Sequence, residues 1–527
     1  MLPPLGAYVA GDLDVARKML QSAARTGASD LRARRLADVA TAAGMTDVAD
    51  NLLRNVALGT IGRSGTMARR RWYDGDMAGA VDELGSGARR EQRQRHQLAS
   101  ELKVFTGWTP QLAPVDGYVP EARTVLHLLT NSLPHTGSGY AQRSHSLLKA
   151  QHELGWNVHA VTRTGYPVQV GRLFAQQKDV LDGVVYHRDL PATLASGFDW
   201  RLQQQADRLL ALALDIRPVV LHTTTHFVNG LVVAAVAGAL GIPWVYEVRG
   251  QLADTWASTR APEARSSQRY TLFRERETAV MHQADAVATL GATMKGDILS
   301  QGLSWEKVLL LPNAVGDSFL TEPHAPHEAR RRLGLPQNGT FIGTVSSLVD
   351  YEGLDDLLRA FALLAGENPD LKCLIVGDGV AAPRLKSLAA ELGVSARVLF
   401  PGRVPRTTAH LYHQALDVFV VPRKDLEVTR SVTPLKPIEA MASARPVASS
   451  DLPALREVVS PGRSGLLFRA DDPADQAAVV GKLVADAALR LKLGQMGRKN
   501  VLAERTWSAN AAVLGRLYSD LAGDPRP

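Results

Sequence analysis

Short apolar runs alternate with longer amphipathic segments from Thr124 onward. Such runs are typical of buried parallel strands, and the longer segments predict the helices that connect them. A first series of strands is predicted at 125–131, 157–163, 219–225, 243–250, 285–291 and 307–315. After a charged stretch from Glu322 to Arg332, a second series is predicted at 341–347, 371–379, 397–402, 416–423 and 445–451. We therefore predict an α/β protein with two successive Rossmann-like domains, at 124–315 and 316–506.

The first part of the chain contains a sequence repeat and lacks the alternating pattern seen from Thr124 onward. GDLDVARKML begins at Gly11, GMTDVADNLL at Gly44 and GDMAGAVDEL at Gly75, which are 33 and 31 residues apart. In each copy an alanine follows the glycine by five residues and a leucine by nine. Glycine at a turn, alanine at a close helix crossing and leucine in a core predict helical hairpins. We expect an all-α domain over residues 1–110 that resembles tetratricopeptide repeats and supports oligomerisation or binding of a protein partner.

A basic helix and a linker follow the repeats. The helix carries arginines at 89, 90, 93 and 95. We interpret them as a solvated face or an interdomain strut, with peripheral contact to an anionic membrane surface as the alternative. Residues 111–123 are rich in proline and glycine and predict a linker.

Composition narrows the class of protein. The chain has 527 residues, 45% hydrophobic and 21% charged, which is typical of globular proteins. A single cysteine, Cys373, excludes an internal disulfide framework and favours a cytoplasmic protein. The net charge of +7 favours anionic partners such as nucleotides or phospholipid head groups. We expect no nucleic acid partner, because zinc-ligand spacing, a helix-turn-helix signature and an aromatic RNA-binding motif are all missing.

The most apolar segment, which begins at Leu231, is interrupted by Gly238, Gly241 and Pro243. It predicts a buried helix followed by a buried strand rather than a membrane span. Charged residues interrupt the apolar positions close to the first residue, so we expect no secretory signal.

Two strand ends carry residues suited to binding an anion. Gly137 and Gly139 follow the first strand and let the backbone approach a ligand closely, although an ordinary strand-to-helix turn explains them equally well. In PRKDLEVTRSVTPLKPIEAM, prolines at 434 and 437 fit the first turn of a helix. The free N–H groups at that start and the charges of Arg423, Arg430 and Lys436 predict a seat for phosphate.

Glu439 lies one turn inside the same predicted helix. We expect it to lie on the cleft side of this helix, where its carboxylate can accept hydrogen bonds from sugar hydroxyls. The alternative is an exposed helix pair between Glu439 and Lys436.

These features together resemble the retaining glycosyltransferases of family 4, which have the GT-B fold. The resemblance rests on the GxG loop, on LPNAV at 311–315, on IVGDG at 375–379 and on KPIEAMASARPVASSDLPALREVV from Lys436, and it covers residues 124–520. It implies two Rossmann-like domains facing across a cleft, with the acceptor in the first and a nucleoside-diphosphate sugar, UDP- or GDP-linked, in the second. It also implies that the helix at 507–527 returns to complete the first domain.

The resemblance also implies roles for individual residues. Glu439 would bind the ribose, the 433–436 loop the diphosphate, and the backbone of Gly402 and Val404 the base. The residues implied in catalysis are Arg423, Lys436, Glu439 and Arg249. Those implied in donor binding are Gly137, Ser138, Gly139, Ser347, Gly377, Gly402, Val404, Arg430, Ser431, Thr433, Pro434 and Leu435. The acceptor-site candidates are His135, His222, His226 and Glu247, with a packed histidine and a Glu247–Arg249 ion pair as the alternatives.

The chain departs from the family pattern at four positions. Ser431 stands where the first of two glutamates is usual, and Ser347 and Glu352 stand where an arginine and a lysine commonly bind phosphate. Arg249 replaces a histidine. We infer that Arg423, Arg430 and Lys436 supply the missing positive charge.

We expect no cofactor and no metal, because cations and N–H groups can stabilise a departing nucleoside diphosphate. The D-x-D sequences at 12–14 and 74–76 fall in repeat turns, where aspartate caps helices. We expect a glycan, lipid-linked or small-molecule acceptor and a role in cell-surface glycan or glycoconjugate biosynthesis. A GT-B-shaped nucleotide-sugar epimerase and a non-catalytic scaffold are the alternatives.

Overall fold

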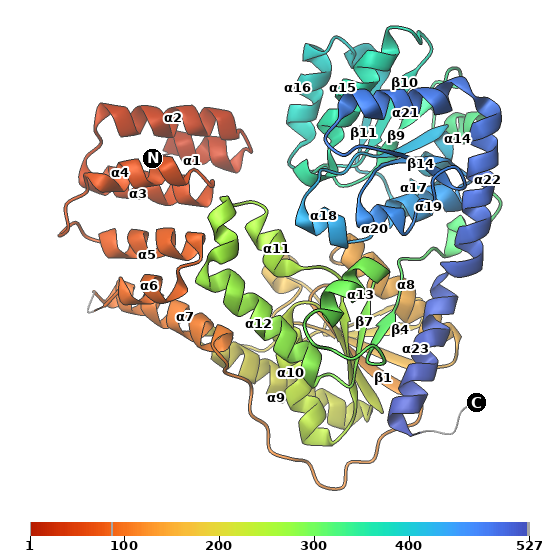
Figure 1. Cartoon of the computed structure of the whole chain (residues 1–527). Helices are drawn as coiled ribbons and strands as arrows, with labels where there is room; N and C mark the ends of the chain where they lie inside the picture. Colours follow the sequence, from red (N-terminus) through yellow and green to blue (C-terminus); the bar gives the residue numbers. More distant parts are fainter. Residues whose placement is uncertain (1, 86–87, 524–527) are drawn as a thin grey trace.

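The computed structural model describes residues 2–85 and 88–523 (Figure 1). Figure 1 shows an N-terminal helical region beside a first α/β domain, with a second α/β domain above the first. The helical region consists of α1 (Leu2–Val9), α2 (Leu13–Thr26), α3 (Asp30–Ala42), α4 (Thr46–Arg54), α5 (Arg63–Asp74), α6 (Met77–Asp82) and α7 (Arg89–Phe105).

The repeated residues lie at equivalent places in three helix pairs. Each repeat glycine lies between the two helices of a pair and has a positive φ of 81°, 72° or 90°, which a side chain would strain. The repeat alanines and leucines are buried between helices. The N-terminal region is therefore helical, as the repeat predicted, and its likeness to tetratricopeptide repeats stays a prediction.

Helix α7 joins the helical region to the first α/β domain. Its last residue, Phe105, packs edge-on against Phe227 and Phe273 of that domain. Lys103 forms an ion pair with Asp199 at 2.8 Å. The four arginines at its start are exposed. The geometry is that of an interdomain strut, and membrane contact stays a prediction.

The first α/β domain contains one sheet of order β3-β4-β2-β1-β5-β6-β7-β8. All its neighbouring strands are parallel except the β3–β4 hairpin. Its strands are β1 (Thr124–Leu129), β2 (Asn157–Thr162), β3 (Lys178–Leu181), β4 (Val184–His187), β5 (Val220–Thr224), β6 (Trp244–Val248), β7 (Ala286–Thr289) and β8 (Val308–Leu310). Its helices are α8 (Gly139–Glu153), α9 (Phe198–Ile216), α10 (Phe227–Leu240), α11 (Leu252–Ala257), α12 (Gln268–Gln283) and α13 (Ala292–Leu299).

The second α/β domain contains a parallel sheet of order β11-β10-β9-β12-β13-β14. Its strands are β9 (Phe341–Val345), β10 (Lys372–Val376), β11 (Val398–Gly402), β12 (Val418–Val421), β13 (Val447–Ser450) and β14 (Gly465–Phe468). Its helices are α14 (Pro326–Arg332), α15 (Leu354–Ala365), α16 (Ala382–Glu391), α17 (Arg406–Ala415), α18 (Glu427–Ser431), α19 (Lys436–Ala442), α20 (Pro453–Arg456), α21 (Pro473–Ala485) and α22 (Ala487–Glu504). Short 3₁₀ helices stand at Val168–Val170, Pro262–Ser266, Asp317–Phe319, Asp350–Glu352 and Ser395–Arg397.

Both sheets are covered by helices on their two faces, so the prediction of two Rossmann-like domains is confirmed. Strands β3, β4 and β14 were not predicted. In β3 every second residue is exposed, and β4 and β14 each contain two residues that are only partly buried, so no long apolar run marks them.

The chain returns to the first domain at its end. Helix α22 leaves the second domain, Val315 and Thr506 form a β-bridge, and α23 (Trp507–Ala522) packs against α8. Trp507, Leu514 and Tyr518 lie in the core of the first domain. Figure 1 shows α22 and α23 running down one side of both domains. Within residues 2–85 and 88–523, every helix is too short or too polar to span a bilayer.

Candidate active site

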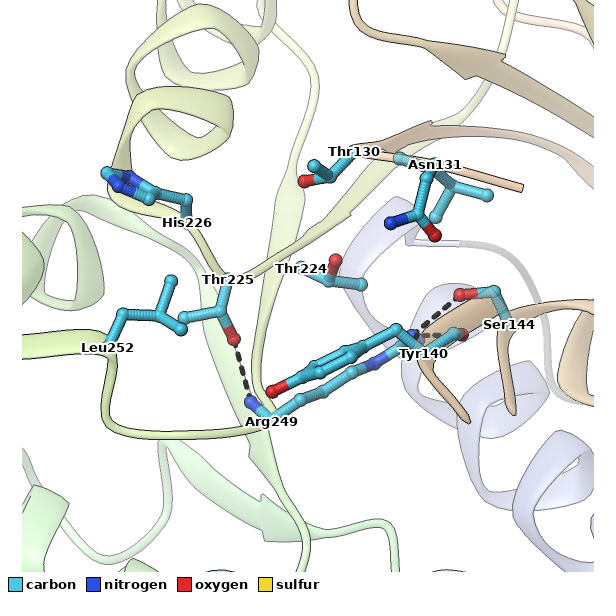
Figure 2. A pocket seen from close by; sticks show the side chains of 10 residues that line it. Thr130, Asn131, Tyr140, Ser144, Thr224, Thr225, His226, Arg249 and Leu252 are labelled. Atoms are coloured by element: carbon cyan, nitrogen blue, oxygen red, sulfur yellow. Dashed lines mark hydrogen bonds between the residues drawn. The ribbon is translucent and has the colours of Figure 1, made fainter. Parts of the chain in front are cut away.

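A cavity of about 210 Å³, with several polar side chains in its lining, opens at the carboxyl edge of the first sheet. Such edges bind ligands in open parallel sheets. Figure 2 shows side chains from the ends of β1 and β5, from the loop after β6 and from α8 around it. Its lining is Leu129, Thr130, Asn131, Tyr140, Ser144, Thr224, Thr225, His226, Arg249 and Leu252.

Arg249 is the cation of this cavity, and its position is fixed on several sides. One terminal nitrogen donates to Ser144 Oγ at 2.6 Å and the other to Glu247 Oε2 at 2.6 Å. Its main-chain N–H donates to Thr225 Oγ1 at 2.8 Å (Figure 2). The buried Nε of Arg249 has no partner among the described residues, which leaves one donor of a fixed guanidinium free.

Glu247 lies beneath the cavity rather than in its wall. The carboxylate is fully buried and also receives Arg143 at 2.6 Å, so two guanidinium groups flank it. Burial alone would raise the pKa of Glu247, but Arg249 and Arg143 outweigh it and hold that pKa well below its usual range. The structure thus contains the Glu247–Arg249 pair that was the alternative, and Glu247 lies outside the lining of this cavity. A role of Glu247 in acceptor binding stays a prediction.

The three candidate histidines occupy different environments. His222 is fully buried, stacks on His127 at 4.7 Å and contacts Tyr518 of α23, so it is a packed core histidine. His135 contacts Asp179 at 3.1 Å, and it lies outside the lining of the cavity. Only His226 lines the cavity, where burial lowers its pKa to about 3 and keeps the ring neutral.

A buried chain of polar contacts leads from the cavity to the second domain. Arg143, paired with Glu247, also donates to Asn313 Oδ1 at 3.0 Å. The side-chain amide of Asn313 then donates to the carbonyl of Thr433 at 2.7 Å. Thr433 precedes α19, so the loop implied in diphosphate binding is held by a residue of the interdomain LPNAV segment.

The start of α19 carries two cations around one carboxylate. Lys436 Nζ lies 2.6 Å from Glu352 Oε1, and Arg423 Nη2 lies 3.1 Å from the same oxygen. Arg423 also donates to the carbonyl of Val432 at 2.9 Å. Lys436 therefore pairs with Glu352 and not with Glu439, which rules against the exposed helix pair.

Arg430 does not join these cations. It is half-exposed on α18 and forms ion pairs with Asp425 and Glu427. Ser431 is buried and donates to the carbonyl of Glu427 at 3.1 Å. The inference that Arg423, Arg430 and Lys436 supply free positive charge together is therefore corrected: two of them share Glu352, and Arg430 is neutralised elsewhere.

Glu439 is half-buried beside His413, with Nε2 and Oε2 3.5 Å apart. Burial raises the pKa of Glu439 to about 7, against the opposing effects of Arg406 and Lys436. The carboxyl group therefore titrates close to neutral pH, which matters for a group that accepts hydrogen bonds from hydroxyls.

The remaining donor-site candidates lie near strand ends of the second sheet and at the start of α8. Gly377 donates its N–H to the carbonyl of Gly402 at 2.9 Å, so these two are neighbours at the ends of β10 and β11. Ser347 is exposed after β9, and Val404 packs on the core of the second domain. Ser138 caps α8 by accepting from Ala141 N–H at 3.2 Å.

Both α/β domains meet around these residues. A Cβ on Gly137 would lie 3.2 Å from Arg403 of the second domain, whereas one on Gly139 would meet nothing within 4 Å. Arg406 donates to Ser146 of α8 at 3.2 Å. Glu457, after α20, accepts from the N–H groups of Ala292 and Thr293 at 2.7 Å and so caps α13 of the first domain. Next to Arg249, a Cβ on Gly250 would lie 4.0 Å from Val432 Cγ2, so the loop after β6 also approaches the second domain.

Two family models match the chain in turn. The model described as glycosyl transferase 4-like domain matches residues 138–314, and the one described as glycosyl transferases group 1 matches residues 327–500. The chain belongs to the family 4 glycosyltransferases. The GT-B fold expected from the resemblance is confirmed, and the helical region precedes the matched part of this glycosyltransferase.

Relatives match a limited part of the chain. The D-inositol 3-phosphate glycosyltransferase of Corynebacterium jeikeium is 33% identical over 218 residues, 40% of this chain and 51% of that protein. The GDP-mannose-dependent alpha-(1-6)-phosphatidylinositol monomannoside mannosyltransferase of Mycolicibacterium smegmatis is 30% identical over 212 residues, 40% of this chain and 55% of that protein. The matched region spans about half the length of these relatives.

Two solved structures share the fold. Sucrose-phosphate synthase from Thermosynechococcus elongatus superposes with a TM-score of 0.63 at 22% identity, covering 76% of this chain and 99% of that one. HepE from Anabaena, solved with UDP and glucose, has a TM-score of 0.60 at 16% identity, covering 76% of this chain and 100% of that one.

Sequence reasoning missed several residues at the site of this glycosyltransferase. Arg143 and Asn313 carry the buried chain between the domains, and Tyr140 lines the cavity. Arg143 lies inside an amphipathic helix, where an arginine normally indicates a solvated face. Asn313 could have been found from the sequence, because it is a polar residue within the otherwise apolar LPNAV segment.

Metal-ligating residues do not gather in the part of the chain that the structure describes, residues 2–85 and 88–523. Asp12 accepts from the N–H of Val15, and Asp76 accepts from that of Gly79, so both cap helices as predicted. Asp74 pairs with Arg70.

Proposed function

We propose that this glycosyltransferase moves a sugar from a nucleoside-diphosphate sugar to an acceptor hydroxyl with retention of anomeric configuration. One observation carries the proposal: the cavity at Arg249 in the first domain is linked through Glu247, Arg143 and Asn313 to the carbonyl of Thr433, in the loop that leads to Lys436 and α19 of the second. The donor would bind at α19, with Glu439 at its ribose, and the acceptor in the cavity. A GDP-mannose-dependent relative and a fold neighbour solved with UDP support a nucleotide-linked donor.

The proposed chemistry needs no protein nucleophile. The bond between the anomeric carbon and the phosphate oxygen breaks while the acceptor oxygen bonds to that carbon from the same face. The acceptor proton passes to the departing phosphate. Negative charge grows on the diphosphate, and fixed cations stabilise it more than they stabilise the ground state.

Release of nucleoside diphosphate tests the proposal. The protein is incubated with UDP- and GDP-linked sugars, with and without candidate glycan, lipid-linked and small-molecule acceptors. Acceptor-dependent release of UDP or GDP with an α-linked product from an α-linked donor supports a retaining transferase. Isomerised sugar without release indicates an epimerase, and binding without either reaction indicates a scaffold.

We predict that donor affinity depends on the titration of Glu439. Its pKa is raised to about 7, so the carboxylate that accepts from ribose hydroxyls is present above about pH 7 and is lost as the pH falls below it. KM for the nucleotide sugar should rise several-fold between about pH 8 and pH 6. The donor phosphates stay ionised over this range. Initial rates measure the effect, and a Glu439→Gln variant should have a flat profile; an unchanged slope in that variant contradicts the prediction.

We predict that turnover does not need a divalent metal. Lys436 and Arg423 stand where charge develops, so cations of the protein would replace the ion. Rates after dialysis against EDTA should stay within about twofold of the untreated rate. Loss of activity that returns with Mg²⁺ or Mn²⁺ would refute this.

The helical region and the arginines of α7 suggest docking to a partner or to an anionic membrane surface in a glycan pathway, with the enzyme itself cytoplasmic. The arginines at 89, 90, 93 and 95 are exposed. Co-sedimentation with vesicles containing an anionic phospholipid should weaken with salt and in a variant with all four changed to glutamine. Equal sedimentation of that variant would exclude the arginines as the contact.

A further inference from the structure

Glu352 is a buried carboxylate at the donor side of the cleft, between two cations. Its Oε1 accepts from Lys436 Nζ at 2.6 Å and from Arg423 Nη2 at 3.1 Å, while Oε2 accepts from Arg423 Nε at 3.4 Å. Its exposed fraction is 4%. The cluster of three groups therefore has a net charge of +1.

The backbone fixes this carboxylate without any ligand. Gly353 has a φ of 66°, and a Cβ there would lie 1.8 Å from the carbonyl oxygen of Pro422, so only glycine allows the loop after β9 to pack this closely on the segment after β12. The N–H of Lys424 donates to the carbonyl of Tyr351 at 3.0 Å. Glu352 and Arg423 are thus held side by side by contacts of their neighbours' main chain.

The two cations depend on Glu352 for their positions. Lys436 has a long, flexible side chain. Without Glu352, this side chain would lose its rotamer freedom only when phosphate binds. Burial alone would raise the pKa of Glu352, but Arg423 and Lys436 hold it at about 2, so the carboxylate is ionised throughout the neutral range. Arg423 in turn holds the carbonyl of Val432, in the loop that leads to α19.

We propose that Glu352 is a positioning residue that keeps Lys436 and Arg423 assembled at the start of α19 for the departing diphosphate. The inference rests on the proposed function and deepens it. Preassembled cations stabilise the transition state without being reorganised during the reaction. The cost is a carboxylate near the bound phosphates, which weakens ground-state binding.

The two effects of Glu352 can be separated, because its loss should act differently on affinity for the nucleoside diphosphate and on kcat. Removing the charge of Glu352 should leave affinity for the nucleoside diphosphate unchanged or stronger, because a repulsive group is gone. It should lower kcat, because the cations are no longer held. A carboxylate that merely neutralises the site would, on removal, raise both affinity and kcat.

The first experiment uses Glu352→Gln, which preserves shape and one acceptor oxygen. We expect kcat with the nucleotide sugar to fall about 10- to 100-fold, and the Kd of UDP or GDP, measured by calorimetry, to stay within about threefold or to tighten. Glu391→Gln on the exposed end of α16 is the matched control and should match the wild type. Unchanged or increased kcat in Glu352→Gln overturns the inference.

The second experiment exchanges the charges, and it decides the matter if Glu352→Gln melts too early to assay. Lys436→Glu alone places two carboxylates together and should abolish measurable turnover. The double variant Glu352→Lys with Lys436→Glu restores one pair of opposite charges beside Arg423, and we expect kcat at least about tenfold above that of Lys436→Glu. No recovery in a folded double variant overturns the inference. A wild-type protein that neither binds nor turns over any nucleotide sugar overturns the proposed function instead, and this inference with it.

Discussion

Replacement of Lys436 by alanine is expected to lower kcat about 100- to 1000-fold, which corresponds to about 3–4 kcal/mol of lost transition-state stabilisation. Lys436 is the first residue of α19, its ammonium contacts Glu352, and its side chain stays 17% exposed. Charge on the departing diphosphate increases in the transition state, so a fixed cation there acts mainly on kcat.

Folding should be nearly unchanged in Lys436→Ala, because Arg423 still pairs with Glu352 through two nitrogens. Initial rates of nucleoside diphosphate release measure the effect, and thermal melting confirms the fold. Lys492→Ala, an exposed lysine on α22, is the matched control. A Lys436→Ala enzyme within threefold of wild-type kcat would show that the diphosphate departs elsewhere.

Replacement of Glu247 by alanine is expected to lower the free energy of unfolding by about 3–5 kcal/mol. The carboxylate is fully buried between Arg143 and Arg249, both themselves almost completely buried. Without it, two guanidinium groups remain close together in the interior, and breaking a buried pair in this way costs more than the pair's own net contribution. Transferase activity should fall as well, because Glu247 orients Arg249 in the cavity.

Urea titration followed by far-ultraviolet circular dichroism and tryptophan fluorescence measures this loss. Trp507 stacks on Arg143, with its ring centre 5.4 Å from the guanidinium carbon, so its fluorescence reports on the same region. Glu275→Ala, at an exposed position on α12, is the control and should lie within about 0.5 kcal/mol of the wild type. A Glu247→Ala protein as stable as this control would mean that the two arginines do not depend on the carboxylate.

The elements that the sequence predicted are those with local signals. Most of the eleven predicted strands coincide with buried runs of apolar residues, and burial on both faces is what makes such runs continuous. Strands β8 and β11 are only partly buried. The repeat glycines marked the helix pairs, because a positive φ at a tight turn requires glycine whatever surrounds it. Strands β3, β4 and β14 were not predicted, because residues in each of them are exposed or only partly buried and no long apolar run marks them.

The sequence predicted where the candidate site lies, but not which of its charged residues form ion pairs. The sequence predicted that Pro434 and Pro437 lie in the first turn of a helix. Helix α19 begins at Lys436, so Pro437 lies in its first turn and Pro434 lies before it. It could not show that Glu352 neutralises part of that charge, or that Asp425 takes up Arg430. Ion pairs between distant segments leave no periodic trace, since any charged residue on the chain could be the partner.

The sequence by itself determined most of the strands, their division between two Rossmann-like domains and the place of a cation-rich helix start, because these follow from burial and backbone geometry within short segments. Only the tertiary structure decided which charges meet: Glu247 between Arg143 and Arg249, Glu352 between Lys436 and Arg423, and Asn313 against the carbonyl of Thr433. The physical reason is that a buried charge is tolerated only beside its partner, and packing of the whole chain selects that partner.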